Sequence, residues 1–105
     1  MIKEITVNEL NQCLNAKKEF QLIDVREPHE KAIADIGGEL IPLSSIPKSL
    51  NRIGKKPVVV YCRSGKRSAD ATQYLQQNLK RDDIYNLKGG ILAWSDEIDS
   101  SIVKY

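Results

Sequence analysis

Cysteine and histidine are scarce in this sequence, which holds two cysteines and one histidine in 105 residues. Cys13 and Cys62 lie far apart, and neither has a further cysteine or a cluster of histidines near it. This excludes a disulfide framework and a zinc site, and we expect neither a metal nor another cofactor. Each cysteine must therefore be judged by its own surroundings.

Long apolar runs are also absent, so no segment of the sequence is predicted to span a bilayer. The first residues lead straight into polar sequence and lack the apolar region of a signal peptide, so we expect a cytoplasmic protein. The formal net charge is only +2, which argues against nucleic acid or a membrane as the main partner.

What is present is the composition of an ordinary globular protein, with 41% hydrophobic and 29% charged residues. A chain of this length can bury a core without disulfides or metals. We expect one domain over residues 1–105, and a monomer by default.

Strand-like and helix-like segments alternate along the chain. Thr6 and Glu9 have the spacing of a capping box that opens the first helix. Strands are predicted at 20–25, 40–41, 58–61 and 84–87, and helices at 7–16, from 27 up to the glycines at 37–38, and at 44–53, 68–80 and 91–98. The alternation predicts an α/β fold, with a parallel sheet covered by helices on both faces.

The loop after strand 58–61 contains the residues most suited to a reactive site. That strand is continuously apolar, as expected at the centre of a sheet, and Cys62 follows it directly. Ligands of open α/β sheets bind beyond the carboxyl ends of the strands. Gly65 permits a positive φ, and Ser68 is predicted to cap the next helix. Such a short loop can turn its N–H groups toward one centre and bind an anion.

Three cations, Arg63, Lys66 and Arg67, fall within five residues of this loop. Together with the N–H groups and the helix dipole they favour a thiolate at Cys62, which would be a good nucleophile and leaving group. A cysteine at a strand end is more often a small buried hydrophobe. The basic, glycine-containing loop reverses that expectation for Cys62, whereas Cys13 shares a helical face with Leu10 and is expected in the core.

Three stretches of the chain together resemble the rhodanese-like family. They are Leu22-Ile23-Asp24-Val25-Arg26-Glu27, the run from Val58 to Ala69 that contains Cys62-Arg63-Ser64-Gly65-Lys66-Arg67-Ser68, and the run from Tyr85 to Trp94 that contains Gly89-Gly90. Each stretch is moderately specific alone, and their order and spacing make the resemblance strong over nearly the whole chain.

The resemblance implies a three-layer domain with a five-stranded, mostly parallel sheet, and a sulfurtransferase. Sulfane sulfur would pass from a small anionic donor such as thiosulfate to Cys62 as a persulfide, and then to cyanide, a thiol or a sulfur-carrier protein. The loop residues would hold the thiolate, the persulfide and the donor: Arg63, Ser64, Gly65, Lys66, Arg67 and Ser68. Asp24 and Arg26 match a family signature and are interpreted as structural supports.

Residues 34–38 depart from a Gly-His-Ile-Pro-Gly stretch found in many members. Here the sequence looks more like the rhodanese modules of adenylating enzymes, which relay sulfur to a carrier protein. A relay module, or a redox sensor without thiosulfate turnover, is therefore an alternative. Phosphatase or arsenate reductase chemistry is less favoured, because only four residues separate Cys62 from Arg67 where phosphatases of this fold have five. A binding module without catalysis is disfavoured by the intact cysteine and basic loop.

Overall fold

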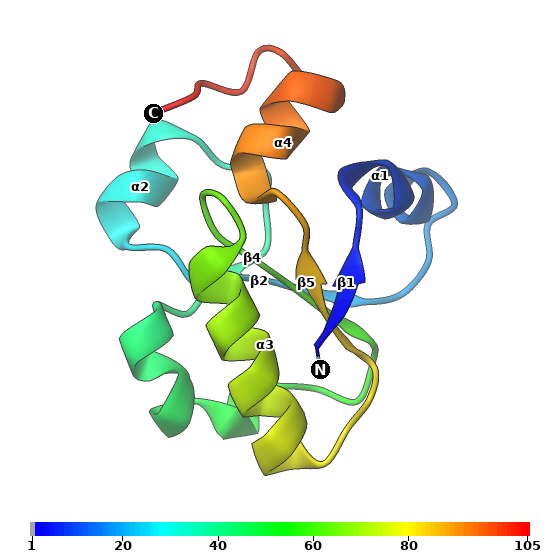
Figure 1. Ribbon diagram of the computed structural model, residues 1–105, viewed down its shortest axis with the longest axis vertical. Helices are drawn as coiled ribbons and strands as arrows, with labels where there is room; N and C mark the ends of the chain where they lie inside the picture. The colour runs from blue at the N-terminus through cyan, green and yellow to red at the C-terminus, as the bar shows by residue number, and fades with distance from the viewer. Residues whose placement is uncertain (1) are drawn as a thin grey trace.

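The computed structural model describes residues 2–105 and contains one five-stranded sheet in which every pairing is parallel. The strands are β1 (Lys3–Ile5), β2 (Gln21–Asp24), β3 (Glu39–Leu40), β4 (Val58–Tyr61) and β5 (Ile84–Leu87). Their order across the sheet is β1-β5-β4-β2-β3, so β4 lies at the centre (Figure 1). The predicted α/β class and parallel sheet are confirmed.

Strand β4 is buried along its whole length because helices cover both of its faces. Alternate side chains of a strand point to opposite faces. Val58 and Val60 accordingly belong to one core cluster, and Val59 and Tyr61 to the other. This explains the uninterrupted apolar run in the sequence, which a strand with one solvated face would not carry.

The helices divide between the two faces. Helix α3 (Lys66–Leu79) and the 3-10 helices η1 (Leu43–Lys48) and η2 (Leu50–Arg52) pack on the cluster that holds Val58. Helices α1 (Val7–Asn15) and α4 (Gly90–Glu97) pack on the other cluster. The short helix α2 (Pro28–Ile33) lies beside the C-terminal segment of the chain (Figure 1). Among residues 2–105, every helix is too short or too polar to span a bilayer.

Several predicted boundaries need correction. Strand β1 was not predicted, because its three residues, Lys3 to Ile5, are too short for a periodic pattern. The segment predicted as one helix at 44–53 forms two 3-10 helices, with Pro47 inside the first. Proline lacks the N–H that an α-helix interior needs. Helix α3 begins at Lys66 rather than at Ser68, and its N-cap is Gly65 with φ +101°.

Cys13 is not in the core, contrary to expectation. It is only half-buried, and Leu14 beside it is exposed. Helix α1 buries Val7 and Leu10 against α4 and the sheet, whereas Cys13 lines a groove between the helix and the sheet. The capping box predicted at Thr6 and Glu9 is confirmed.

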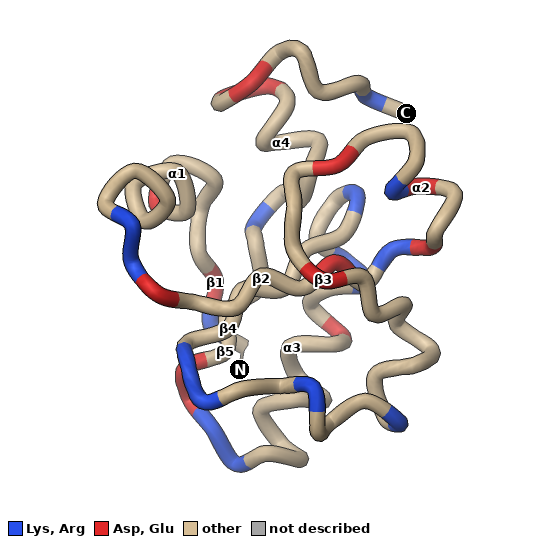
Figure 2. The backbone as a smooth tube through the Cα atoms, turned by 180° about the vertical axis from the view of Figure 1, so that it is seen from behind, with Lys and Arg blue, Asp and Glu red and all other residues tan. Residues whose placement is uncertain are grey.

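Charged residues of both signs are distributed along the backbone (Figure 2). Helix α2 carries both acidic and basic positions beside the C-terminal segment. This mixed region borders the loop that follows β4, because Arg67 of α3 bonds to Glu30 of α2. The charge of the loop therefore depends on α2 as well as on its own sequence.

Candidate active site at the carboxyl end of β4

Cys62 is 1% exposed at the point where β4 ends. Its Sγ accepts hydrogen bonds from the N–H of Gly65 at 3.1 Å and from the N–H of Ser68 at 3.4 Å. Gly65 can turn its N–H back toward the sulfur because it adopts the left-handed region, which glycine enters without strain. The loop therefore places two backbone donors on one sulfur, an arrangement that stabilises negative charge there.

Ser68 lies in the first turn of α3 instead of capping it, and its side chain is buried between two acceptors. Its hydroxyl oxygen is 3.3 Å from Cys62 Sγ and 2.5 Å from Asn86 Oδ1. A hydroxyl has one proton, so it can donate to the sulfur or to the amide, but not fully to both. Ser68 is thus a third donor that is available to the sulfur.

Asn86 of β5 holds this arrangement together and was not singled out from the sequence. Its Nδ2 donates to the Gly65 carbonyl at 3.2 Å and to Glu4 Oε2 at 3.0 Å, which turns Oδ1 toward Ser68. A polar amide within an otherwise apolar buried strand was the available signal, because a buried amide requires hydrogen-bond partners.

The start of α4 fixes the other side of the loop. The Ile91 N–H donates to the Cys62 carbonyl at 2.9 Å, and the Leu92 N–H donates to the Arg63 carbonyl at 3.1 Å. A Cβ on Gly90 would lie 2.5 Å from each of these carbonyl oxygens. The glycine pair therefore lets two chain segments approach closely, and the carbonyl oxygens are turned away from the sulfur.

The three loop cations are placed unequally. Arg67 is half-buried and forms a bidentate pair with Glu30, at 2.7 and 2.9 Å. Arg63 is exposed, with its Nε donating to the Tyr105 carbonyl and its guanidinium over the Tyr105 ring. Lys66 is exposed and has no ion-pair partner within residues 2–105. Ser64, the remaining predicted loop residue, is exposed as well.

Glu30 and Tyr105 bind the two loop arginines, and neither residue was predicted to do so from the sequence. The Tyr105 hydroxyl donates to Glu30 Oε2 at 2.8 Å. The hydrogen bonds from Arg67 are the main cause that lowers the pKa of Glu30 to about 2, against partial burial. The same pairing raises the pKa of Arg67. Both groups are charged in neutral solution.

Asp24 and Arg26 form a buried ion pair below α2. Arg26 donates from Nε and Nη2 to the two carboxylate oxygens at 2.9 and 2.8 Å, and from Nη2 to the Ala34 carbonyl at 2.7 Å. Burial opposes the charge of Arg26, but the bonds to Asp24 outweigh it and raise its pKa. Arg26 also donates to the Tyr105 hydroxyl at 3.0 Å. The pair is thus linked to the loop through Tyr105, which also binds Arg63, and it does not contact Cys62.

A family model described as "Rhodanese-like domain" matches residues 6–97. The chain belongs to the rhodanese-like family. It is 42% identical to a sulfurtransferase of Allochromatium vinosum, over 90% of each chain. A rhodanese-like domain protein of Staphylococcus aureus superposes with a TM-score of 0.82 at 34% identity, over 99% of each chain. The chain is also 38% identical to a segment of a probable adenylyltransferase/sulfurtransferase, MoeZ, of Mycobacterium tuberculosis. That segment makes up 26% of the MoeZ chain. Relatives of this family thus include proteins named as sulfurtransferases.

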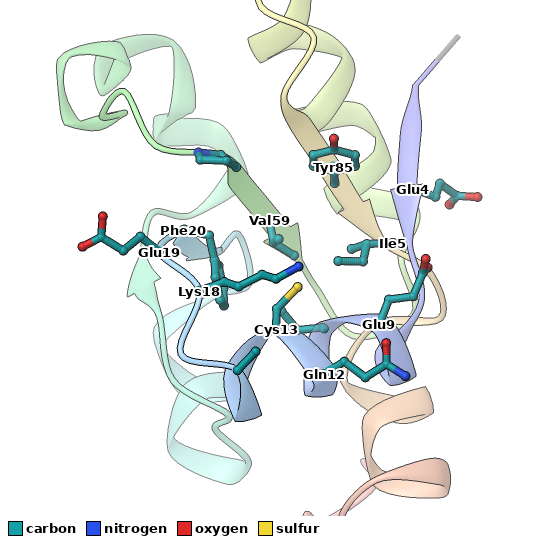
Figure 3. Close-up of a pocket in the computed structure, with 13 residues that line it drawn as sticks. Glu4, Ile5, Glu9, Gln12, Cys13, Lys18, Glu19, Phe20, Val59 and Tyr85 are labelled. Atoms are coloured by element: carbon teal, nitrogen blue, oxygen red, sulfur yellow. The ribbon is translucent and has the colours of Figure 1, made fainter.

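A groove of this rhodanese-like domain lies away from Cys62. The groove, of about 550 Å³, runs between α1 and the sheet, lined by Cys13, Phe20, Val59 and Tyr85 among others (Figure 3). The sulfur of Cys13 faces the groove, where no hydrogen bond joins it to another of residues 2–105. The two cysteines therefore differ in surroundings as well as in position.

Proposed function

We propose that Cys62 accepts a sulfane sulfur as a persulfide and passes it to a thiophilic acceptor. The observation that carries the proposal is the convergence of two fixed donors on Cys62 Sγ, the N–H groups of Gly65 and Ser68, with the Ser68 hydroxyl available as a third. Donors fixed in this way stabilise the thiolate before attack and the terminal persulfide charge after it.

With thiosulfate as the donor, the transfer takes two steps. The Cys62 thiolate attacks the outer sulfur of thiosulfate, a new S–S bond forms, the old S–S bond breaks, and sulfite leaves with the electron pair. In the second step cyanide or a thiolate attacks the terminal sulfur of the persulfide. Thiocyanate or an acceptor persulfide is released, and the Cys62 thiolate is restored.

Arg63, Ser64, Gly65, Lys66, Arg67 and Ser68 are proposed to surround the transferred sulfur and its donor. Gly65 and Ser68 act on the sulfur through the hydrogen bonds given above. Lys66 supplies an exposed positive charge at the start of α3. Asp24 and Arg26 are proposed to support the loop indirectly, through the contacts of Arg26 with α2 and Tyr105.

A sulfur relay to a carrier protein is the second candidate. It is favoured by the 38% identity to a quarter of an adenylyltransferase/sulfurtransferase chain. A redox sensor that pairs its two cysteines is disfavoured, because Cys13 lies on α1, which covers the sheet face opposite to the cluster that contains Cys62.

Intact-mass spectrometry tests the proposal directly. Incubation with a sulfur donor should add one sulfur atom, roughly 32 Da, because the activated thiolate is the attacking group. The Cys13→Ser variant should gain the same mass and Cys62→Ser none. Thiosulfate, mercaptopyruvate and a cysteine desulfurase are the donors to compare. No adduct with any of them, or an adduct that persists in Cys62→Ser, would contradict the proposal.

A further inference from the structure

The charge of Arg67 is already matched inside the protein. Both terminal guanidinium nitrogens bond to the two oxygens of Glu30, at 2.7 and 2.9 Å, in the geometry that binds a carboxylate most tightly. The Glu30 side chain is 9% exposed and that of Arg67 is 35% exposed. The pair uses two of the five N–H donors of Arg67, and its main effect on a second anion is that the arginine's charge is already neutralised.

Glu30 is held in this position by several groups. The Glu27 N–H donates to its Oε1 at 3.1 Å, and the Tyr105 hydroxyl donates to its Oε2 at 2.8 Å. Arg26 in turn donates to the Tyr105 hydroxyl, so Tyr105 is itself fixed. A carboxylate with this many donors does not swing away from Arg67 at low cost. It is a permanent negative charge at the edge of the loop.

We propose that Glu30 determines which sulfur donors Cys62 accepts, by neutralising Arg67 and so disfavouring a dianionic donor relative to one of low charge. The inference rests on the proposed persulfide function of Cys62. Thiosulfate carries two negative charges to the loop, whereas the protonated form of an alkyl persulfide, which is the form whose outer sulfur can be attacked, carries none. In the latter case Cys62 attacks the outer sulfur, the S–S bond breaks, and an alkyl thiolate leaves.

The test measures the second-order rate constant for Cys62 persulfide formation with two donors, thiosulfate and 2-hydroxyethyl persulfide. Glu30→Gln keeps the side-chain shape and removes the charge. It should raise the thiosulfate rate constant by about tenfold, since one uncompensated charge at a partly exposed site acts with roughly that factor. The rate constant for 2-hydroxyethyl persulfide, expressed for its protonated form, should stay within about twofold, because that reacting form has no charge to interact. Added salt should reduce the thiosulfate gain.

Two further variants separate charge from structure. Arg67→Gln should lower the thiosulfate rate constant, because it leaves the Glu30 carboxylate unmatched. The double variant Glu30→Gln/Arg67→Gln should return it to within about threefold of wild type, because the site is neutral again. Asp70→Asn is the matched control. It removes an exposed carboxylate of α3 that forms no ion pair with Arg67, and it should leave the rate constants for both donors unchanged.

Equal changes for both donors in Glu30→Gln, or failure of the double variant to restore thiosulfate use, would overturn the inference. The comparison of Arg67→Gln with the double variant tests the inference even if Glu30→Gln alone folds poorly. The proposed function fails separately, by the absence of a Cys62 persulfide in the wild-type protein with every donor.

Discussion

The two cysteines of this domain lie in contrasting surroundings. Cys62 is almost fully buried, yet two backbone N–H groups donate to its sulfur and the Ser68 hydroxyl lies 3.3 Å from it. Cys13 is more exposed and faces a groove of about 550 Å³, but its sulfur has no such donors within residues 2–105. The proposed reactive thiol, Cys62, is therefore distinguished by the fixed donors around its sulfur rather than by exposure. These donors stabilise negative charge at the sulfur.

The two regions also differ in how they are built. The groove beside Cys13 lies between α1 and the sheet, and its lining is largely apolar. The region of Cys62 combines segments from β4, β5, α2, α3, α4 and the C-terminal segment. Substitutions near Cys62 should therefore change both stability and transfer, whereas substitutions near α1 should change stability alone.

The largest effect is expected at Gly90. A Cβ there would lie 2.5 Å from the carbonyl oxygens of Cys62 and Arg63, so Gly90→Ala must push the loop away from α4. We expect a loss of more than about 3 kcal/mol in the free energy of unfolding, and a transfer rate at least about tenfold lower because the nucleophile is displaced. Denaturant unfolding and steady-state kinetics measure the two.

Gly37→Ala is the matched control, because Gly37 also has a positive φ but no atom within 4 Å of the Cβ position. It should lose about 1–3 kcal/mol from backbone strain and keep its transfer rate. Equal losses of transfer in the two variants would mean that α4 does not position the loop.

The next effect concerns the ion pair below α2. Arg26→Met leaves the Asp24 carboxylate buried without its partner, which should cost about 3–5 kcal/mol in the free energy of unfolding. A second change, Asp24→Asn, removes the orphaned charge and should recover part of the loss. Chemical denaturation of the single and double variants measures this. A double variant no more stable than Arg26→Met would show that the pairing with Asp24 is not the main contribution.

An acid titration tests the Glu30–Arg67 pair as a stabilising contact. The pKa of Glu30 is lowered from 4.5 to about 2, chiefly by its hydrogen bonds from Arg67. The unfolded chain thus binds the proton more readily, so this stabilisation is complete above pH 4.5 and is lost as the pH falls toward 2. The stability gap between wild type and Glu30→Gln should shrink by about 3 kcal/mol over that range. A gap that does not depend on pH would contradict the assignment.

The sequence predicts the parts of this molecule that depend on local pattern. The apolar run at 58–61 identified the central strand, and Cys62, Gly65 and the basic residues identified the loop after it. The capping role predicted for Ser68 was wrong, because Gly65 already turns the chain into the helix and frees the serine to face the sulfur.

The missing parts are contacts between distant segments. Glu30, Asn86 and Tyr105 lie 32 residues before, 24 after and 43 after Cys62, counted from their numbers in the sequence. Only the fold brings them to the same end of the sheet. Cys13 was misplaced for a related reason. Its helical spacing from Leu10 was correct, but the packing of α1 on α4 decides which part of that face is covered.

The smallest effect is expected on the Cys13 side, at the capping box of α1. Thr6 Oγ1 accepts from the Glu9 N–H at 3.1 Å, and Glu9 Oε1 accepts from the Thr6 N–H at 2.9 Å. Thr6→Ala should cost about 1 kcal/mol in the free energy of unfolding, the usual loss when a cap is removed. Thermal and denaturant unfolding measure it.

Transfer by Thr6→Ala should stay within about twofold of wild type, because no contact joins the cap to the loop and fraying of α1 stays local. The contrast with Gly90→Ala is therefore qualitative as well as one of size. A marked loss of persulfide formation in Thr6→Ala would mean that α1 is coupled to Cys62 across the sheet, through β1 and the Glu4–Asn86 contact, and that the two regions are not independent.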